Sequence, residues 1–293
     1  MTGTEQGPSG RARSTALWVV AFILAVGAGA YQRMTGPTYP VHGTAQIAGH
    51  SYRYRLPRNG ISTGDRVISL PSAPVITGGV LRYRRLRSTD EWSTRPLVID
   101  GERWDAAIPR QPAAGKVAYQ VLLDTRDGAV TLPPDGPAVM RFKNPVPAWL
   151  LVPHILLMFS ALLLGVRAGL GAVLAPRGLR AVVYATVAVM TLGGLVLGPL
   201  VQRAAFGQLW TGFPFGRDLT DNKTIIMWIV WVVAALAVVG AGPRLRRVRV
   251  ITCGAAIIML AVFMIPHSVQ GSELDYTTLE RGPTNAAPDA PGR

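Results

Sequence analysis

Two histidines beside apolar segments are the residues of this sequence best suited to chemistry. His154 lies about two turns into an apolar run that begins near residue 148, and His267 follows the last apolar run of the chain. A neutral imidazole nitrogen can bind a metal ion or serve as an axial ligand of heme iron. A single histidine at such a position is more simply explained as a hydrogen-bonded interfacial residue. A metal site at His154 and His267 therefore requires that the two lie together.

The segment 202–223 lies between these histidines in sequence and combines aromatic with polar side chains. They are Phe206, Trp210, Phe213, Phe215, Arg217, Asp218, Asp221, Asn222 and Lys223. One interpretation is an aromatic belt at a membrane surface, in which Asp221 or Asn222 caps the next helix. The other is a ligand site. These residues by themselves leave both interpretations open.

Five apolar stretches must position these residues. A hydrocarbon core roughly 30 Å thick needs about 20 helical residues, and the stretches approach that length with almost no charge. They are residues 15–31, 148–166, 181–201, 224–241 and 250–266. The scarcity of ionisable residues inside them argues against a proton relay or an ion-coupled transporter. The sequence predicts a multi-pass membrane protein.

The arginines predict how the chain is oriented, because short cytoplasmic loops retain positive charge. They cluster before the first stretch, between the second and third, and between the fourth and fifth, at Arg11, Arg13, Arg167, Arg177, Arg180, Arg244, Arg246, Arg247 and Arg249. We therefore expect residues 1–14 to be cytoplasmic in a bacterial inner (plasma) membrane. Residues 34–146, the loop 202–223 and a disordered tail 271–293 are then extracytoplasmic. The first segment, 15–33, is either a transmembrane helix or a cleaved signal peptide.

Within residues 34–146, the stretch 43–144 has a different pattern, with short alternating strands separated by Gly, Pro and Asp. In the stretch 117–123, Val117, Tyr119 and Val121 alternate along one face, and Asp100-Gly101 and Asp127-Gly128 are turn pairs. This region resembles the immunoglobulin or fibronectin type III-like modules of exported proteins. The expected fold class is therefore a membrane α-helical protein of about five transmembrane helices plus an extracytoplasmic all-β sandwich.

The order of features in residues 147–276 resembles the heme-handling membrane proteins of cytochrome c biogenesis. The matching stretches are WLLVPHILLMFSALLLG, the polar loop with KTIIMWIVW, and a last helix ending IPHSVQGSELDY. That family places a tryptophan-rich WWD segment between two histidines on the extracytoplasmic side. The resemblance aligns His154 and His267 with the flanking histidines, Trp210 with an aromatic of that segment, and Lys223 with the start of the next helix. The loop has FPFGRDLTDN in place of the family's Trp-Asp-Pro core.

This resemblance implies a cofactor, heme b, with His154 and His267 as iron ligands. Trp210, Phe213 and Phe215 would cover the porphyrin, and Arg203, Arg217 or Lys223 would pair with its propionates. The competing hypothesis is a cofactor-free membrane subunit that presents its β domain to an extracytoplasmic protein partner. A small-molecule transporter is a third.

Composition limits the classes of partner and cofactor that the protein can have. The chain has 30 basic and 16 acidic residues, for a net charge of +14, but much of this charge flanks apolar runs. Membrane lipid rather than nucleic acid is therefore the expected partner of the basic residues. The single cysteine, Cys253, excludes an internal disulfide, a CxxC pair and a c-type heme attachment motif.

Overall fold

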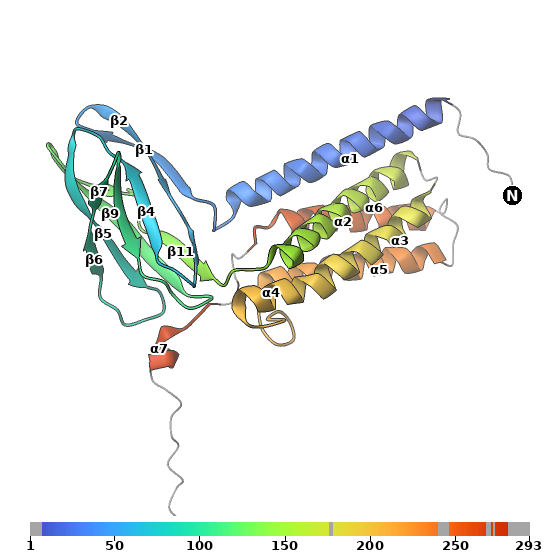
Figure 1. Ribbon diagram of the computed structural model, residues 1–293. Coiled ribbons are helices and arrows are strands. Elements are labelled where there is room, and N and C mark those ends of the chain that lie inside the picture. The colour runs from blue at the N-terminus through green and yellow to red at the C-terminus, as the bar shows by residue number, and fades with distance from the viewer. Residues whose placement is uncertain (1–7, 176–177, 240–245, 268–270, 272, 281–293) are drawn as a thin grey trace, which may run out of the picture. The chain divides into compact units, whose positions relative to one another are not determined.

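The computed structural model describes residues 8–175, 178–239, 246–267, 271 and 273–280. The chain forms two compact units, one of residues 1–39 with 146–272 and the other of residues 40–145 with 273–293. The first unit is helical and the second is built on strands (Figure 1). Arg177, Arg244, the first seven residues and the tail from 281 lie outside the described residues.

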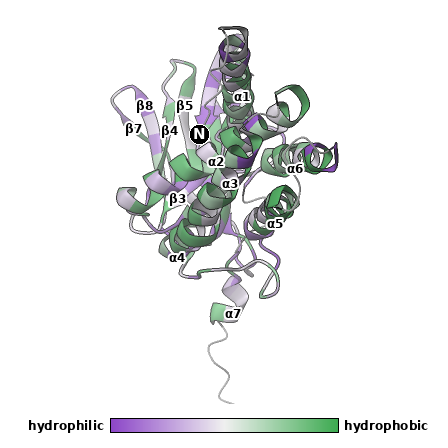
Figure 2. Ribbon diagram, turned by 90° about the vertical axis from the view of Figure 1, so that its right-hand side faces the viewer, coloured by the Kyte–Doolittle hydropathy of each residue, from purple (hydrophilic) through white to green (hydrophobic). Residues whose placement is uncertain are grey.

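Five helical segments among the described residues are long and apolar enough to cross a membrane. They are Gly10–Thr35 within α1 (Pro8–Thr35), α2 (Ala148–Leu174), the continuous segment Leu179–Phe206, α5 (Leu219–Val239) and α6 (Arg246–Met264). The segment Leu179–Phe206 consists of α3 (Leu179–Met190), a π-helical stretch η1 (Thr191–Leu197) and α4 (Gly198–Phe206). Apolar residues cover the outer faces of these helices (Figure 2), as expected for helices that face lipid.

Small and bulky side chains together pack the interior of the helical unit. Ala21 and Ala25 of α1 are fully buried, and Phe22 meets Phe159 of α2 edge to face. Gly165 and Gly169 of α2 let α6 approach closely, since a Cβ at either would lie 2.5 Å from a side-chain atom of α6. Such small-residue contacts are how helices associate without a hydrophobic driving force between them.

The strand unit corrects the expected all-β sandwich. Its strands divide among three small sheets instead of two facing layers: β1-β2, β3-β11-β9-β5-β6 with β10 on β9, and β4-β8-β7. The order along the chain is one helix, then the sheets, then the remaining helices. The strands are β1 (Val41–Ile47), β2 (His50–Leu56), β3 (Asn59–Ile61), β4 (Arg66–Pro71), β5 (Ile76–Arg85), β6 (Ser93–Pro96), β7 (Val98–Asp100), β8 (Arg103–Ile108), β9 (Lys116–Thr125), β10 (Gly128–Leu132) and β11 (Ala138–Lys143).

Proline explains part of this division, because it cannot donate a ladder hydrogen bond. Pro57 follows β2, Pro71 ends β4 and Pro96 ends β6, so strands that could have continued are cut short. One core nevertheless joins the three sheets. Val117, Tyr119 and Val121 of the central strand β9 are fully buried, as the alternation predicts. Ala118 and Gln120 between them are also buried, so β9 is covered on both faces.

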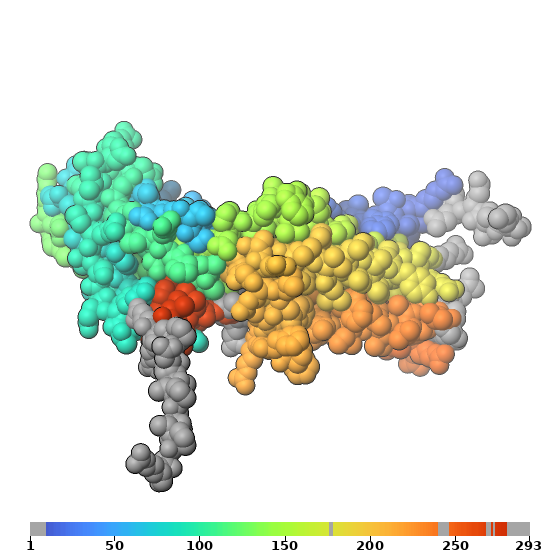
Figure 3. All heavy atoms as spheres, turned by 60° about the horizontal axis from the view of Figure 1, so that its bottom comes forward, coloured from blue at the N-terminus to red at the C-terminus, as the bar shows by residue number. Residues whose placement is uncertain are grey.

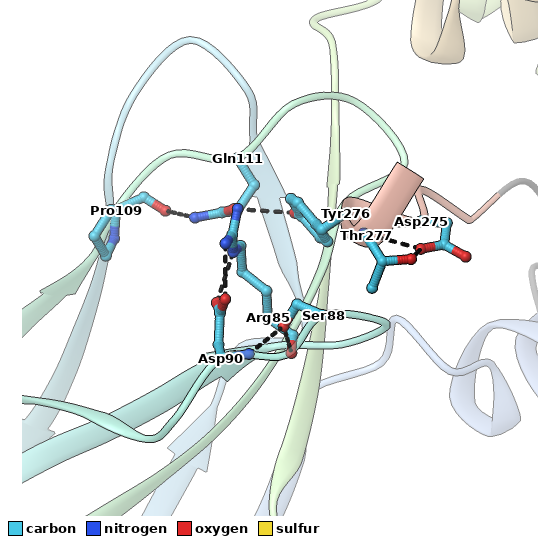
Figure 4. Close-up of polar contacts among 8 residues, drawn as sticks. All are labelled: Arg85, Ser88, Asp90, Pro109, Gln111, Asp275, Tyr276 and Thr277. Carbon is cyan, nitrogen blue, oxygen red and sulfur yellow. Dashed lines mark hydrogen bonds and ion pairs between the residues drawn. The ribbon is translucent and has the colours of Figure 1, made fainter. Parts of the chain in front are cut away.

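A short C-terminal segment corrects the expected disordered tail over residues 273–280. The amides of Leu274 and Tyr276 donate to the carbonyls of Ala114 and Arg87, and α7 (Tyr276–Glu280) follows. Glu273 pairs with Lys116 at 3.1 Å and Arg87 at 3.4 Å. The Tyr276 ring is buried beneath the Arg85 guanidinium, whose centre lies 4.6 Å from the ring centroid (Figure 4). We call residues 273–280 the C-terminal latch.

Candidate functional site

His154 is oriented by a backbone carbonyl. Its Nδ1 lies 2.9 Å from the carbonyl oxygen of Gly193, which belongs to η1. A carbonyl can only accept, so Nδ1 carries the proton and Nε2 of the neutral ring keeps its lone pair. Histidines that bind metals are commonly held in this way, with one nitrogen fixed by a hydrogen bond and the other free to coordinate.

The π-helical stretch explains why that carbonyl is within reach. Pro199 follows at the start of α4 and has no amide to donate, which disturbs the ordinary helical ladder. The Gly193 carbonyl accepts from the Gly198 amide, five residues on, as well as from His154. Gly193 and Gly194 also allow close packing, since a Cβ at either would lie 2.8 Å from Leu157 or Thr224. Sequence reasoning missed this role, although the pattern TLGGLVLGP contains the signal.

Lys223 and His267 lie at the same end of the helical unit. Lys223 is in the second turn of α5, is 2 % exposed, and donates from Nζ to the carbonyl of Ile265 just beyond α6. His267 follows two residues later and keeps an exposed surface. Desolvation lowers the pKa of His267, and the positive charge of Lys223 lowers it further. Lys223 and the segment that carries His267 are therefore neighbours at this end of the helical unit.

The loop 207–218 is held by the start of α5. Asp221 is buried and accepts from the amides of Thr211 at 2.7 Å and Gly212 at 2.9 Å and from Nε2 of Gln202 at 3.2 Å. The neighbouring Asn222 accepts from the Phe213 amide at 2.7 Å. Neither residue is the helix cap expected from sequence, because Asp218 provides that contact through its bond from the Thr220 amide.

The aromatic residues of this loop do not enclose the histidines. The Trp210 indole donates within the loop, to the carbonyl of Phe213 at 3.0 Å. Phe213 and Phe215 are 72 % and 82 % exposed, and Arg217 is also exposed. The structure thus places Lys223 beside the segment that leads to His267, and it leaves Phe213, Phe215 and Arg217 at the surface. The interpretation of Phe213 and Phe215 as a buried porphyrin cover is not supported.

The available metal-ligating side chains limit the kind of metal site that could form at the end of the helical unit that carries His154 and His267. Within the described ranges, no group of three or more His, Cys, Asp and Glu residues could hold a metal ion. A heme supplies four nitrogens of its own and needs only one or two axial ligands from the protein. Two neutral imidazoles and a buried lysine fit that requirement better than they fit a bare cation. No family model, curated protein or solved structure matches this chain.

Proposed function

We propose that this chain is a multi-pass membrane protein that binds a b-type heme at the end of the helical unit holding His154 and His267. The observation that supports it is the hydrogen bond between His154 Nδ1 and the Gly193 carbonyl. That bond orients an imidazole with Nε2 available inside an apolar segment. The expected orientation places this end outside the cytoplasm, because the arginine clusters before the first stretch, between the second and third and between the fourth and fifth belong to the other side.

Each of the three residues has a role in this proposal. His154, oriented through Nδ1, and His267 would hold the heme iron through their free ring nitrogens. Lys223 carries the positive charge that pairs with a propionate. A bound heme would supply one-electron chemistry, and the chain's part is to hold and orient it. The protein either passes heme to an acceptor or uses it for electron transfer.

The test is the absorption spectrum of the full chain, expressed with added heme precursor and purified in detergent. We expect a Soret band with about one heme per chain by pyridine hemochrome assay, as two axial ligands serve one iron. His154→Ala should abolish the band. His50→Ala is the matched control, because His50 is exposed on β2 and should leave the band unchanged. A purified wild-type chain without a Soret band would exclude the heme function.

A second candidate function is docking of an extracytoplasmic protein by the strand unit. An open groove of about 360 Å³ runs beside β7 and β8, with Val67, Arg95, Val98 and Asp105 among its lining residues. Val98 and Ile99 of the edge strand β7 are 62 % and 57 % exposed. Exposed apolar residues at a sheet edge favour partner binding. Crosslinking from Val98 in membranes would test it, with no adduct expected if this candidate is wrong.

A further inference from the structure

The loop 207–218 presents two phenylalanines from a fixed backbone. Phe213 and Phe215 are 72 % and 82 % exposed, while the residues around them are bonded in place. Asp221 binds the Thr211 and Gly212 amides, and Asn222 binds the Phe213 amide. A flexible loop could turn such rings inward, but this loop is anchored at Phe213 itself and at the two residues before it. The rings therefore stay outside the protein interior.

Glycine fixes the same conformation from within the loop. A Cβ at Gly212 would lie 2.5 Å from the Asp221 Cβ, and one at Gly216 would lie 2.3 Å from the Thr211 carbonyl oxygen. The amides of Phe215 and Gly216 both donate to the Gly212 carbonyl. The backbone between the two rings is thus a compact, closed turn. In Figure 3 the gold part of the chain that includes this loop projects from the side of the helices.

The position of the loop determines what can cover the rings. It joins two candidate membrane spans, which end at Phe206 and begin again at Leu219. A connection of about a dozen residues, folded on itself, stays close to the membrane surface. Exposed arginines lie on both sides, Arg203 in the last turn of α4 and Arg217 at the end of the loop. Aromatic rings beside cationic side chains are typical of the level of lipid headgroups.

We propose that the loop 207–218 is a lipid-binding finger that inserts Phe213 and Phe215 into the bilayer interface. The occupant of this apolar surface is membrane lipid and not a protein. Burying exposed aromatic surface in the interface is favourable because it removes apolar area from water. The finger is independent of heme: it holds the start of α5 at a set depth in the membrane whether or not a cofactor is bound.

The single cysteine makes a direct test possible. In a Cys253→Ser background, Phe213→Cys and Phe215→Cys are labelled separately with a nitroxide and reconstituted into phosphatidylcholine vesicles containing phosphatidylglycerol. Oxygen concentrates in lipid and a polar nickel chelate concentrates in water. The ratio of oxygen accessibility to chelate accessibility at a nitroxide therefore rises with its depth in the bilayer. Val98→Cys in β7 is the water reference, and Ile229→Cys in α5 is the lipid reference; both native side chains are exposed.

We expect the ratio at both finger positions to exceed that at Val98 several-fold and to fall below that at Ile229. A ratio equal to that at Val98 would place the loop in water and overturn the proposal. Low accessibility to both reagents would mean that protein covers the rings, which would also overturn it. Matching gel-filtration profiles of all labelled variants show that the comparison concerns folded protein. Because heme is not involved, this result is separable from the Soret measurement.

Discussion

The Tyr276 hydroxyl donates a 2.9 Å hydrogen bond to Oε1 of Gln111, although 165 residues separate the two in sequence (Figure 4). Gln111 belongs to the strand unit, which follows the first candidate span, and Tyr276 follows the fifth. A folded polar unit cannot reach through the bilayer core to make such a contact. An even number of crossings must therefore lie between the two residues, and the four candidate spans between them satisfy this condition.

The first prediction follows from that contact and concerns topology. The strand unit and the C-terminal end should lie on one side of the membrane, and Arg246, Arg247 and Arg249 at the start of α6 on the other. The positive-inside rule makes the arginine side cytoplasmic. Reporters fused after Arg293 and after Val239 should give opposite activities, with the first active only outside. Equal activities would mean that α6, the candidate span between the two fusion points, does not cross.

The second prediction concerns the C-terminal latch. Tyr276→Ala removes a buried ring, its bond to Gln111 and its contact with Arg85, so the latch should open more often. Large-to-small changes of buried aromatic residues cost about 3 kcal/mol, or roughly a hundredfold in a local equilibrium. Hydrogen exchange at the backbone amides of Leu274 and of position 276 should accelerate accordingly.

The matched control for the latch is Thr278→Ala, since Thr278 is exposed and bonds only within the segment, to the Asp275 carbonyl. It should leave exchange at Leu274 nearly unchanged. If Tyr276→Ala and Thr278→Ala behaved alike, the latch would not be held by its tyrosine.

Much of the helical unit was predictable from sequence because apolar length is a local property. All five stretches correspond to long helices, although each has at least one end several residues from the expected limit, most of all α2, which ends at Leu174 and not at residue 166. The arrangement of the sheets was harder to predict from sequence. Strand pairing depends on where Pro57, Pro71 and Pro96 interrupt strands and on contacts between residues that are distant in sequence. Three sheets therefore stand where a sandwich was expected.

In the candidate site, too, individual residues could be predicted from sequence, but their contacts with residues distant in sequence could not. His154 could be identified from sequence because a polar residue in an apolar run is conspicuous, and Lys223 because it belongs to the polar cluster just before such a run. The partner of His154 could not, because the Gly193 carbonyl is exposed to it by a π-helical turn rather than by a side chain. The latch was not predicted because it is held by contacts with Arg85, Arg87 and Lys116. The sequence of the tail contains no pattern that indicates these contacts.

The third prediction concerns the pH dependence of the Arg85–Asp90 pair beneath the latch. Arg85 donates to both carboxylate oxygens at 2.6 and 2.7 Å. These hydrogen bonds hold the pKa of Asp90 below its usual range, against a smaller opposing effect of burial. A carboxylate with a lowered pKa stabilises the fold above its unfolded pKa of about 3.9, and this stability is lost as pH falls through the folded value.

The measurement compares wild type with Asp90→Asn, which cannot ionise. Both partners are partly exposed, so the pair should contribute no more than about 1 kcal/mol. The stability of the strand unit, followed by pulse proteolysis of the full chain, should be higher for wild type at pH 7. The difference should shrink below about pH 4 as Asp90 takes up its proton. A difference that stays constant down to pH 3 would show that the ionised pair is not its source.

The fourth prediction concerns Asp221, which closes the loop 207–218 against α5. Asp221→Ala leaves the Thr211 and Gly212 amides and Nε2 of Gln202 without this acceptor, and Gly212 is buried. Bonds to a charged acceptor contribute about 1.5 to 3 kcal/mol each, and water at the surface can replace some of them. We expect a net loss of about 3 kcal/mol, measured as the folded fraction remaining on gel filtration after heating in detergent.

Two further variants separate the anchoring role of Asp221 from a general effect of charge at this end of the molecule. Asp221→Asn keeps one acceptor oxygen and should lose less stability, whereas Arg217→Gln changes an exposed charge and should lose almost none. Asp221 makes its recorded bonds to the loop and to Gln202, not to His154. Any Soret absorbance of Asp221→Ala should therefore fall only in proportion to the folded fraction. If it vanished while the chain stayed folded, the loop would have to contribute to the heme site directly.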